Sequence, residues 1–377
     1  MLATVAQAAE WSLTPSAGLG VFYDTNPGLV TTEHESSGGA YGNAVLGFQY
    51  ATERSQAALG AAYYGARYRE EGFENDDEGV IGLRSFTRPT ERQTLGLDGE
   101  YRRSSLYEQR AQTEPGTGDI RDTDVGLARV RRDYWWAEPR WGVQMTERNA
   151  LDVRYRHTEA QYDEILDDYD EDIGTIAVAH TLDPRDEIRF GVRRSRYRSP
   201  SADTRSTTST VFLGFGRAFT ATSRMELYAG GAKATEETGT EKYDVTGYVF
   251  RAGLTQRTEL TRLELVLSRD AHPSGGGRLV ASDQVRMDLN HRVAERSEIW
   301  LRAWVFRDSV LQGEDPTLDR TYAEIEPGWS WSWTPELAVI ASYRYRRQKY
   351  DVDDSAASSN AVFAGLGYSW PKYSVSR

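Results

Sequence analysis

Apolar and polar residues alternate along most of the chain. From residue 337 to 346 the odd positions carry Leu, Val, Ala, Tyr and Tyr, while the even positions end in Ser342, Arg344 and Arg346. Successive side chains of a β-strand point to opposite faces, so this segment predicts a strand with one apolar face and one arginine-bearing face. The same period of two recurs in "NALDVRYRH" (149–157) and "TRLELVLSR" (261–269), and helical periodicity is absent.

Short polar turns divide these strand-like segments at regular intervals. Eight of them recur, most at spacings of roughly 36 to 40 residues: "ATERS" (51–55), "RPTER" (88–92), "MTERN" (145–149), "LDPRD" (182–186), "TATSR" (220–224), "TQRTEL" (255–260), "VAERS" (293–297) and "WTPEL" (333–337). Longer connections, most of them acidic, alternate with the turns: "TNPGLVTTEHESSGG", "EEGFENDDEG", "YEQRAQTEPGTGDIRD", "DEILDDYDED", "SPSADTRS", "TEETGTEK", "HPSGGG", "LQGEDPTLD" and "DVDDSAASS". The count predicts about 18 strands, with 16 as the alternative.

Alternating strands, short turns and long loops are together typical of a transmembrane β-barrel. The predicted fold class is therefore all-β, a transmembrane antiparallel up-and-down β-barrel in a bacterial outer membrane, because only a closed barrel leaves no backbone group unpaired in hydrocarbon. Trp329, Trp331 and Trp333 share one face beside a short turn, as an interfacial aromatic girdle would. A soluble sandwich is the alternative, but it would direct charged side chains into its core.

The composition limits the possible cellular compartments and binding partners of the chain. The net charge of −12 and the pI near 5.1 argue against a nucleic-acid partner, and no apolar run of about 18 residues could form a membrane-spanning helix. The absence of cysteine fits an envelope protein. Residues 1–8 are expected to be the remnant of a secretory signal, with "AQA" before Ala9 as its cleavage site, and residues 9–377 to be one barrel domain. A disordered alanine-rich end is the alternative for the first segment.

The last strand, "NAVFAGLGYSW", carries Gly365, Tyr368 and Trp370 in a G-x-x-Y-x-W arrangement. This resembles the recognition signal that bacterial barrels present to the barrel-assembly machinery, although "PKYSVSR" follows it here. With "GVFYDTNPGL", "DRTYAEIEPGWSWSWTPEL" and "YRYRRQKYDV", the chain resembles the β-barrel porin family associated with bacterial exopolysaccharide secretion systems. The resemblance implies a protein without catalytic residues that helps a polymer to reach the cell surface, together with periplasmic export proteins.

Parity along the strands predicts which charged side chains face the lumen. The expected lumen residues are arginines placed mostly before the long loops: Arg67, Arg69, Arg84, Arg102, Arg154, Arg156, Arg189, Arg193, Arg302, Arg344 and Arg346. A cationic ring of this kind would attract a small anionic solute or an acidic polysaccharide, because the arginine fork matches a carboxylate. The alternative is that these arginines pair with acids of the wall and only hold the strands together.

Other chemistries receive little support. "DDYDEDIG" offers Asp168, Asp170 and Asp172, but it lacks the glycine and glutamate spacing of an EF-hand, so no metal or cofactor is expected. The five histidines accompany no nucleophile motif, so no enzymatic activity is expected. The first hypothesis is a passive conduit or accessory component in exopolysaccharide export, embedded among outer-membrane lipid and lipopolysaccharide. The alternatives are a general or anion-preferring porin for small solutes, or a structural barrel whose loops bind a partner.

Overall fold

The computed structural model describes residues 9–31, 34–70, 75–105, 131–163, 166–273, 279–310, 319–350 and 356–376. The expected signal remnant at residues 1–8 lies outside these residues, as do the whole of "YEQRAQTEPGTGDIRD" and parts of the other expected loops, among them residues 274–278, 311–318 and 351–355. The strands are β1 (Glu10–Asp24), β2 (Ser37–Ala51), β3 (Ser55–Tyr68), β4 (Asp76–Thr90), β5 (Gln93–Ser105), β6 (Arg131–Gln144), β7 (Asn149–Tyr162), β8 (Tyr169–Thr181), β9 (Asp186–Ser199), β10 (Thr204–Thr220), β11 (Ser223–Thr238), β12 (Glu241–Arg257), β13 (Thr261–Pro273), β14 (Leu279–Ala294), β15 (Ser297–Val310), β16 (Arg320–Ser332), β17 (Leu337–Tyr350), β18 (Ala356–Ser369) and β19 (Tyr373–Ser376).

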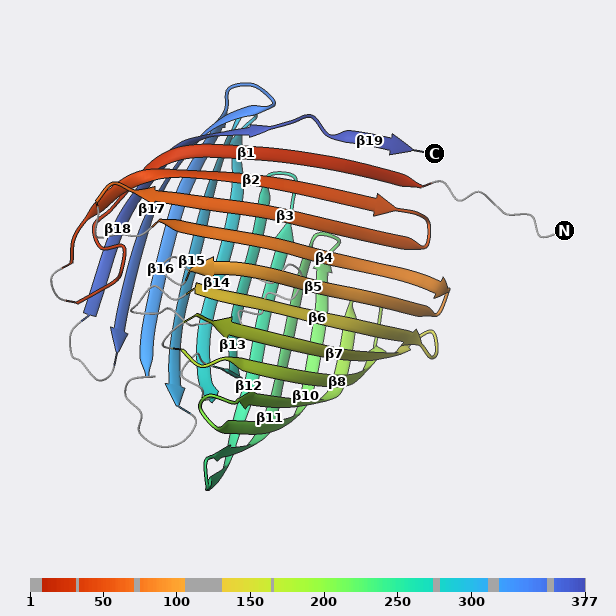
Figure 1. The fold of residues 1–377 in the computed structure, drawn as a ribbon. Coiled ribbons are helices and arrows are strands. Elements are labelled where there is room, and N and C mark those ends of the chain that lie inside the picture. Colours follow the sequence, from red (N-terminus) through yellow and green to blue (C-terminus); the bar gives the residue numbers. More distant parts are fainter. Residues whose placement is uncertain are drawn as a thin grey trace.

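Strands β1 to β18 form one closed antiparallel barrel. Each strand pairs with its neighbour in sequence, and β1 closes the circle by pairing with both β2 and β18. The short β19 continues the line of β18 along the start of β1, where Trp11 pairs with Val375. Figure 1 shows β1 lying against β18 and β19. The predicted fold is confirmed with 18 strands rather than 16, and "PKYSVSR" serves to lengthen the closing seam.

All eight predicted short turns lie at one end of the barrel, and the longer connections lie at the other. Short turns face the periplasm in barrels of this type, so the opposite end is the outer one. Apart from β19, the strands have 13 to 17 residues and are longer than the roughly 10 needed to cross a bilayer. Much of "TEETGTEK" accordingly belongs to β11 and β12, with only residues 239 and 240 between them.

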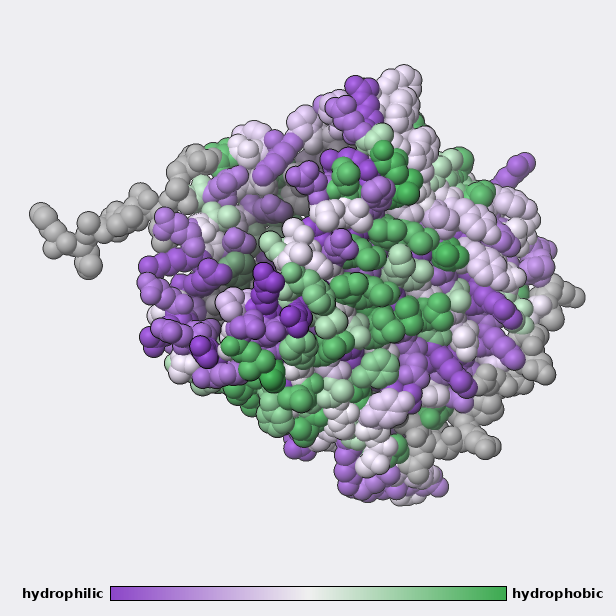
Figure 2. Space-filling model, turned by 180° about the vertical axis from the view of Figure 1, so that it is seen from behind, coloured by the Kyte–Doolittle hydropathy of each residue, from purple (hydrophilic) through white to green (hydrophobic). Residues whose placement is uncertain are grey.

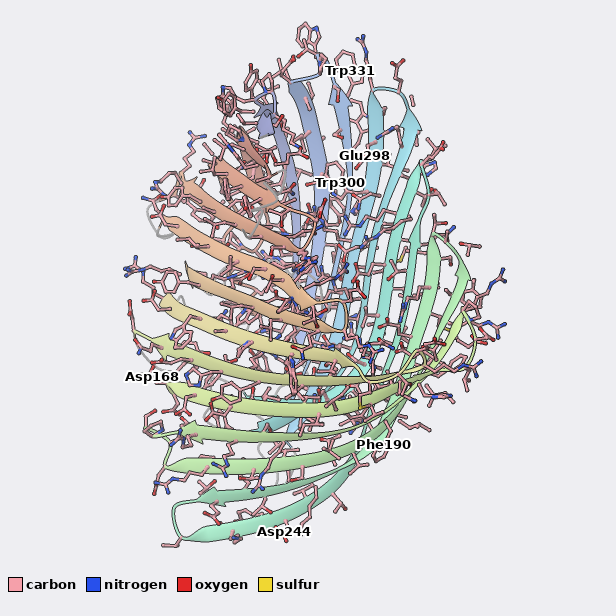
Figure 3. The ribbon with its side chains drawn as sticks, turned by 90° about the vertical axis from the view of Figure 1, so that its right-hand side faces the viewer. Asp168, Phe190, Asp244, Glu298, Trp300 and Trp331 are labelled. Atoms are coloured by element: carbon pink, nitrogen blue, oxygen red, sulfur yellow. The ribbon has the colours of Figure 1, made fainter. Side chains whose placement is uncertain are left out.

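The outer wall of the barrel is apolar and aromatic. Exposed large side chains alternate along the strands, as Leu19, Val21 and Tyr23 do on β1. Figure 2 shows hydrophobic residues gathered in the middle of one face, with hydrophilic residues toward its edges. In Figure 3, Phe190 and Trp331 point away from the barrel, whereas Trp300 lies inside it. No helix in the described ranges is long and apolar enough to cross a membrane.

These faces decide the environment of the molecule. A closed barrel with an apolar outer wall and a charged inner wall is built for a bacterial outer membrane, where lipid contacts the outer face and water fills the lumen. The same side-chain pattern excludes the soluble sandwich, because the charged side chains face the lumen rather than a dry core.

Glycines allow the two ends of the sheet to approach each other at the seam. Gly20 of β1 pairs with Gly365 of β18, and the ring of Tyr41 from β2 lies over both. A Cβ atom added at Gly20 would lie 2.4 Å from the carbonyl oxygen of Ala364 and 2.7 Å from the Tyr41 ring. The close approach of backbone to backbone therefore requires a residue without a side chain at this position.

We expect Gly20→Ala to weaken barrel closure by about 1 to 3 kcal/mol, because the added methyl group forces the β1–β18 seam apart. Gly60→Ala is the matched control, since a Cβ atom at that position of β3 meets nothing within 4 Å. The measurement is the urea concentration at which half of each variant, folded in lipid vesicles, loses the gel mobility of the unheated barrel. Equal midpoints would contradict the role assigned to the seam glycines.

Candidate functional site: the arginine-lined lumen

Nine of the eleven predicted lumen arginines lie on the inner wall. Strand register and the exposed apolar side chains fix the inner positions of each strand, and these positions hold Arg84, Arg102, Arg154, Arg156, Arg189, Arg193, Arg302, Arg344 and Arg346. They lie at different heights rather than in a single ring at the mouth, since Arg189 is the fourth residue from the periplasmic end of β9 and Arg102 the fourth from the outer end of β5.

The lumen assignment was wrong for Arg67. Leu59 and Tyr63 face outward from β3, and Arg67 has the same parity, so its side chain lies on the outer face. There its Nη1 lies 3.0 Å from Asp77 Oδ1, which also accepts a hydrogen bond from the Tyr63 hydroxyl at 2.5 Å. Arg69 lies beyond the end of β3, and its predicted lumen position stays a prediction. Charged residues are tolerated outside at this height because headgroups and water replace hydrocarbon.

Wall acids accompany the inward arginines. Some pairs join neighbouring strands, such as Arg156 Nε to Glu138 Oε2 at 2.8 Å, and others join positions two apart on one strand, such as Arg189 Nη2 to Glu187 Oε1 at 3.1 Å. Each of the nine arginines has at least one such carboxylate within 4.0 Å. The alternative interpretation, in which wall acids pair with the arginines, therefore describes much of the lumen.

A cavity of about 430 Å³ on the inner face of strands β6 to β12 is nevertheless lined mainly by arginines among its charged residues. Seven arginines line it against four acids: Arg140, Arg154, Arg156, Arg189, Arg193, Arg224 and Arg251 against Glu138, Asp152, Glu187 and Glu226. Two acids outside the lining, Asp98 and Asp270, reach Arg140 and Arg193. Within the lining itself the arginines outnumber the acids by seven to four, in a chain of net charge −12.

Glycines leave room for the long arginine side chains in this cavity. A Cβ atom at Gly216 of β10 would lie 3.4 Å from Nη2 of Arg224, and one at Gly214 would lie 3.4 Å from Cβ of Arg189. A guanidinium carries five N–H donors, of which one carboxylate contact uses one or two. Arg189 and Arg224 are also 40% and 52% exposed, so their remaining donors can bind a solute carboxylate.

The cavity offers apolar and hydroxyl groups beside these cations. Phe212 and Tyr228 line it with ring centroids 5.5 Å apart. The hydroxyl of Thr210 is buried in the lining and has no hydrogen-bond partner in the described part of the chain. Guanidinium, ring and hydroxyl groups together suit a small solute with a carboxylate and polar substituents.

One ion pair bridges the wall beside the cavity. Arg193 of β9 donates two hydrogen bonds to Asp270 of β13, from Nη1 to Oδ2 at 2.8 Å and from Nη2 to Oδ1 at 2.5 Å. Three strands lie between these two in the barrel. The bridge passes over small inner positions, since Thr210, Ala232 and Gly247 follow Arg193 in register. Its charges therefore project farther into the lumen than those of neighbouring-strand pairs.

Above the cavity, an aromatic cluster covers the inner wall of β6 to β9. Its buried members are Tyr134, Trp136, Ala160, Tyr162, Tyr169 and Tyr197. The guanidinium of Arg156 lies 4.3 Å from the Trp136 ring centroid, and that of Arg132 lies 4.9 Å from the Tyr134 ring. Stacking of this kind holds the planar cations in fixed orientations.

The loop after β1 folds into the outer mouth on the opposite wall. Leu29, at a positive φ of 49°, packs against Trp304, Phe306 and Tyr322. Asn26 Nδ2 donates to the carbonyl oxygen of Val30 at 2.8 Å and closes the turn. Non-glycine residues rarely adopt this backbone conformation, so the packing of Leu29 has to hold it.

Ionic contacts tie the base of that loop to the barrel. Asp24 accepts a hydrogen bond from Arg346 Nη2 at 2.7 Å, and the same nitrogen donates to the carbonyl oxygen of Pro27 at 3.2 Å. Beyond the loop, the Ser37 hydroxyl donates to Glu70 and holds the pKa of that carboxyl below its ordinary value. Sequence reasoning missed this inward loop, although the apolar pair Leu29 and Val30 in a polar segment was a signal for it.

The histidines and the acidic residues between 167 and 172 lie outside the described lining of the arginine-lined cavity. His157 Nδ1 lies 2.9 Å from Asp172 Oδ1 on the outer wall, and His291 Nδ1 lies 2.8 Å from Thr261 Oγ1. Asp168 accepts a hydrogen bond from the Tyr162 amide at 2.7 Å. In the ranges that the structure covers, no three His, Cys, Asp or Glu side chains are grouped to hold a metal ion.

No protein-family model matches the sequence, and a search of curated proteins finds no match. Among solved structures, the chain is similar to OccAB2 of Acinetobacter baumannii (10% identity, 96% of this chain and 98% of that chain, TM-score 0.49) and to a BenF-like porin of Pseudomonas fluorescens Pf-5 (10%, 98% and 99%, 0.48). It is also similar to Pseudomonas aeruginosa OccK2 in complex with glucuronate (10%, 96% and 98%, 0.48). Identity at this level assigns no family.

We expect Glu138→Gln to lower the free energy of unfolding by about 3 kcal/mol, because it removes the carboxylate beside the buried guanidinium of Arg156. Glu226→Gln is the matched control, since its partner Arg224 and Glu226 itself are more than half exposed, and the loss there should stay below about 1 kcal/mol. Urea unfolding followed by tryptophan fluorescence in lipid vesicles measures both. Similar losses in the two variants would refute the buried pair's structural role.

We expect Leu29→Ser to raise the single-channel conductance, because the loop loses its apolar contact with Trp304, Phe306 and Tyr322 and leaves the mouth. Thr31→Ala, at an exposed position of the same loop, should conduct like the parent chain. Planar-bilayer recordings compare the three proteins. A conductance unchanged by Leu29→Ser would show that the loop does not narrow the pore.

Proposed function

We propose that this chain is an outer-membrane porin for small solutes, with a preference for anions. The observation that carries the proposal is the cavity of about 430 Å³ with seven arginines against four acids. Its volume lies within the roughly 300 to 1,000 Å³ typical of small-molecule sites. Arginine recognises carboxylates through a planar pair of N–H donors, so a sugar acid or a similar carboxylate is the class of solute that fits best.

The preference for anions should be modest. Most of the inward arginines have a carboxylate partner, so the mean field of the lumen is weak and selectivity arises where arginines exceed acids. Glucuronate, the ligand named for the OccK2 structure, combines a carboxylate with hydroxyl groups and is a convenient probe for this chain. Neutral solutes of the same size should pass more slowly.

Exopolysaccharide export remains the second candidate function, but no described feature favours it over a small-solute pore. A polymer needs a wide, continuous path, whereas the loop at Leu29 lies inside the outer mouth and the Arg193–Asp270 bridge projects into the lumen. The outward-facing Tyr368 and Trp370, whose ring centroids lie 4.9 Å apart, would be presented to the assembly machinery together with Gly365.

Charge changes at the lumen bridge should shift selectivity in opposite directions. In planar bilayers under a tenfold KCl gradient, the parent chain should give a reversal potential of the anion-selective sign. Asp270→Asn should increase this potential, because it removes a carboxylate facing the lumen, and Arg193→Gln should decrease it.

Asp244→Asn is the control for that experiment, since this carboxylate pairs with Lys233 on the outer face and lies away from the lumen. It changes the net charge of the chain by the same amount as Asp270→Asn but should leave the reversal potential unchanged. A cation-selective parent chain, or equal shifts from the two aspartate variants, would overturn the proposed function.

A further inference from the structure

The outer face of β9 changes abruptly from apolar to cationic. Ile188, Phe190 and Val192 are exposed on this face, and Arg194, Arg196 and Arg198 continue it toward the outer end of the strand. All six side chains share one parity, so all of them face away from the lumen. The step from Val192 to Arg194 therefore marks the level at which acyl chains give way to headgroups.

The neighbouring strand β10 adds to the same patch. Arg205 pairs in register with Arg198, Thr207 with Arg196, and Ser209 with Arg194. Below them Val211 and Leu213 are 52% and 59% exposed, and they continue the apolar surface of β9. The patch thus combines four guanidinium groups and two hydroxyl positions above an apolar surface.

The acids near this patch have other partners. Asp172 of β8 stands opposite Arg196 in register, but it accepts a hydrogen bond from Tyr155 and lies 3.9 Å from Arg198, which also has Asp170 at 3.2 Å. Glu237 of β11 stands opposite Arg205 but pairs with Lys242 at 2.6 Å. Among the described residues, Arg194 and Arg196 have neither a side-chain hydrogen bond nor an ion pair.

Two other hairpins of the outer rim are arranged differently. In β3–β4, Asp77 lies between Tyr63 and Arg67, and in β5–β6 Asp133 accepts a hydrogen bond from Tyr101 at 2.6 Å and lies 3.9 Å from Arg103. Arg67 and Arg103 are thus each paired with a carboxylate of the protein itself. Arg194 and Arg196, at the centre of the β9–β10 patch, lack such a partner among the described carboxylates and therefore call for an anion from outside the chain.

We propose that Arg194, Arg196 and Arg205 bind the phosphates of lipopolysaccharide in the outer leaflet. Arginine forks match phosphate oxygens in two-point contacts, and the step at Val192 places these forks at headgroup height. The acyl chains lie along Phe190, Val192, Val211 and Leu213. The site is on the lipid-facing wall, so it is independent of what passes through the lumen.

Native mass spectrometry of the detergent-solubilised barrel with bis-phosphorylated lipid A tests this site. The parent chain should retain the lipid, and the double variant R194Q/R196Q should bind it at least about tenfold more weakly, because two charged two-point contacts are lost. Heat-modifiable migration and channel conductance of the variant should stay at parent values, which shows that the barrel is intact. Equal lipid retention by the variant and the parent chain would overturn the proposal.

Three comparisons identify the source of any binding. The variant R54Q/R92Q removes two cations from the periplasmic turns and should retain lipid A like the parent chain. Dephosphorylated lipid A should bind the parent chain about as weakly as bis-phosphorylated lipid A binds R194Q/R196Q. Inorganic phosphate at the same concentration should not displace the lipid. Loss of lipid in R54Q/R92Q, tight binding of the dephosphorylated lipid, or displacement by phosphate would each contradict a lipopolysaccharide site on β9 and β10.

Discussion

A backbone that crosses hydrocarbon must bond all of its N–H and C=O groups within the protein, because lipid offers no partner for them. The barrel meets this requirement by pairing β1 with β18 and by letting β19 extend the seam along the start of β1. Closure needs the two edge strands to approach closely, which explains Gly20 facing Gly365 beneath the Tyr41 ring. The short turns, the up-and-down order and the strict alternation of faces all follow from this one constraint.

Because side chains alternate between the two faces of each strand, the barrel has an inner and an outer surface of different chemistry. The proposed functions follow from the residues on each surface. The inner surface combines arginines with acids, which stabilises long charged side chains in a wet lumen. Glycines of β10 leave a cavity where arginines exceed acids, and this local excess is the basis for the proposed anion preference. The outer surface uses the same residue types at headgroup height, where Arg194 and Arg196 form no ion pair in the described part of the chain, although Asp172 stands opposite Arg196.

Turn spacing and parity were sufficient to predict the strand count, the antiparallel order and the inner position of nine arginines, because a period of two has only one register that places the apolar residues outside. The assignment failed at Arg67, since apolar residues occupy both parities of β3 and its sequence does not mark the outer face. The bridge from Arg193 to Asp270 joins strands far apart in sequence, so no local pattern predicts it. The inward loop has one local signal, the apolar pair Leu29 and Val30, but its packing partners Trp304, Phe306 and Tyr322 are distant in sequence.

Liposome swelling with solutes of graded size and charge tests the account most directly. Vesicles that contain the purified barrel should swell quickly in sodium glucuronate, more slowly in glucose, and not at all in a dextran larger than the cavity. Slow swelling in both monosaccharide solutions, or rapid entry of the dextran, would contradict a pore that selects small anionic solutes at the arginine-lined cavity.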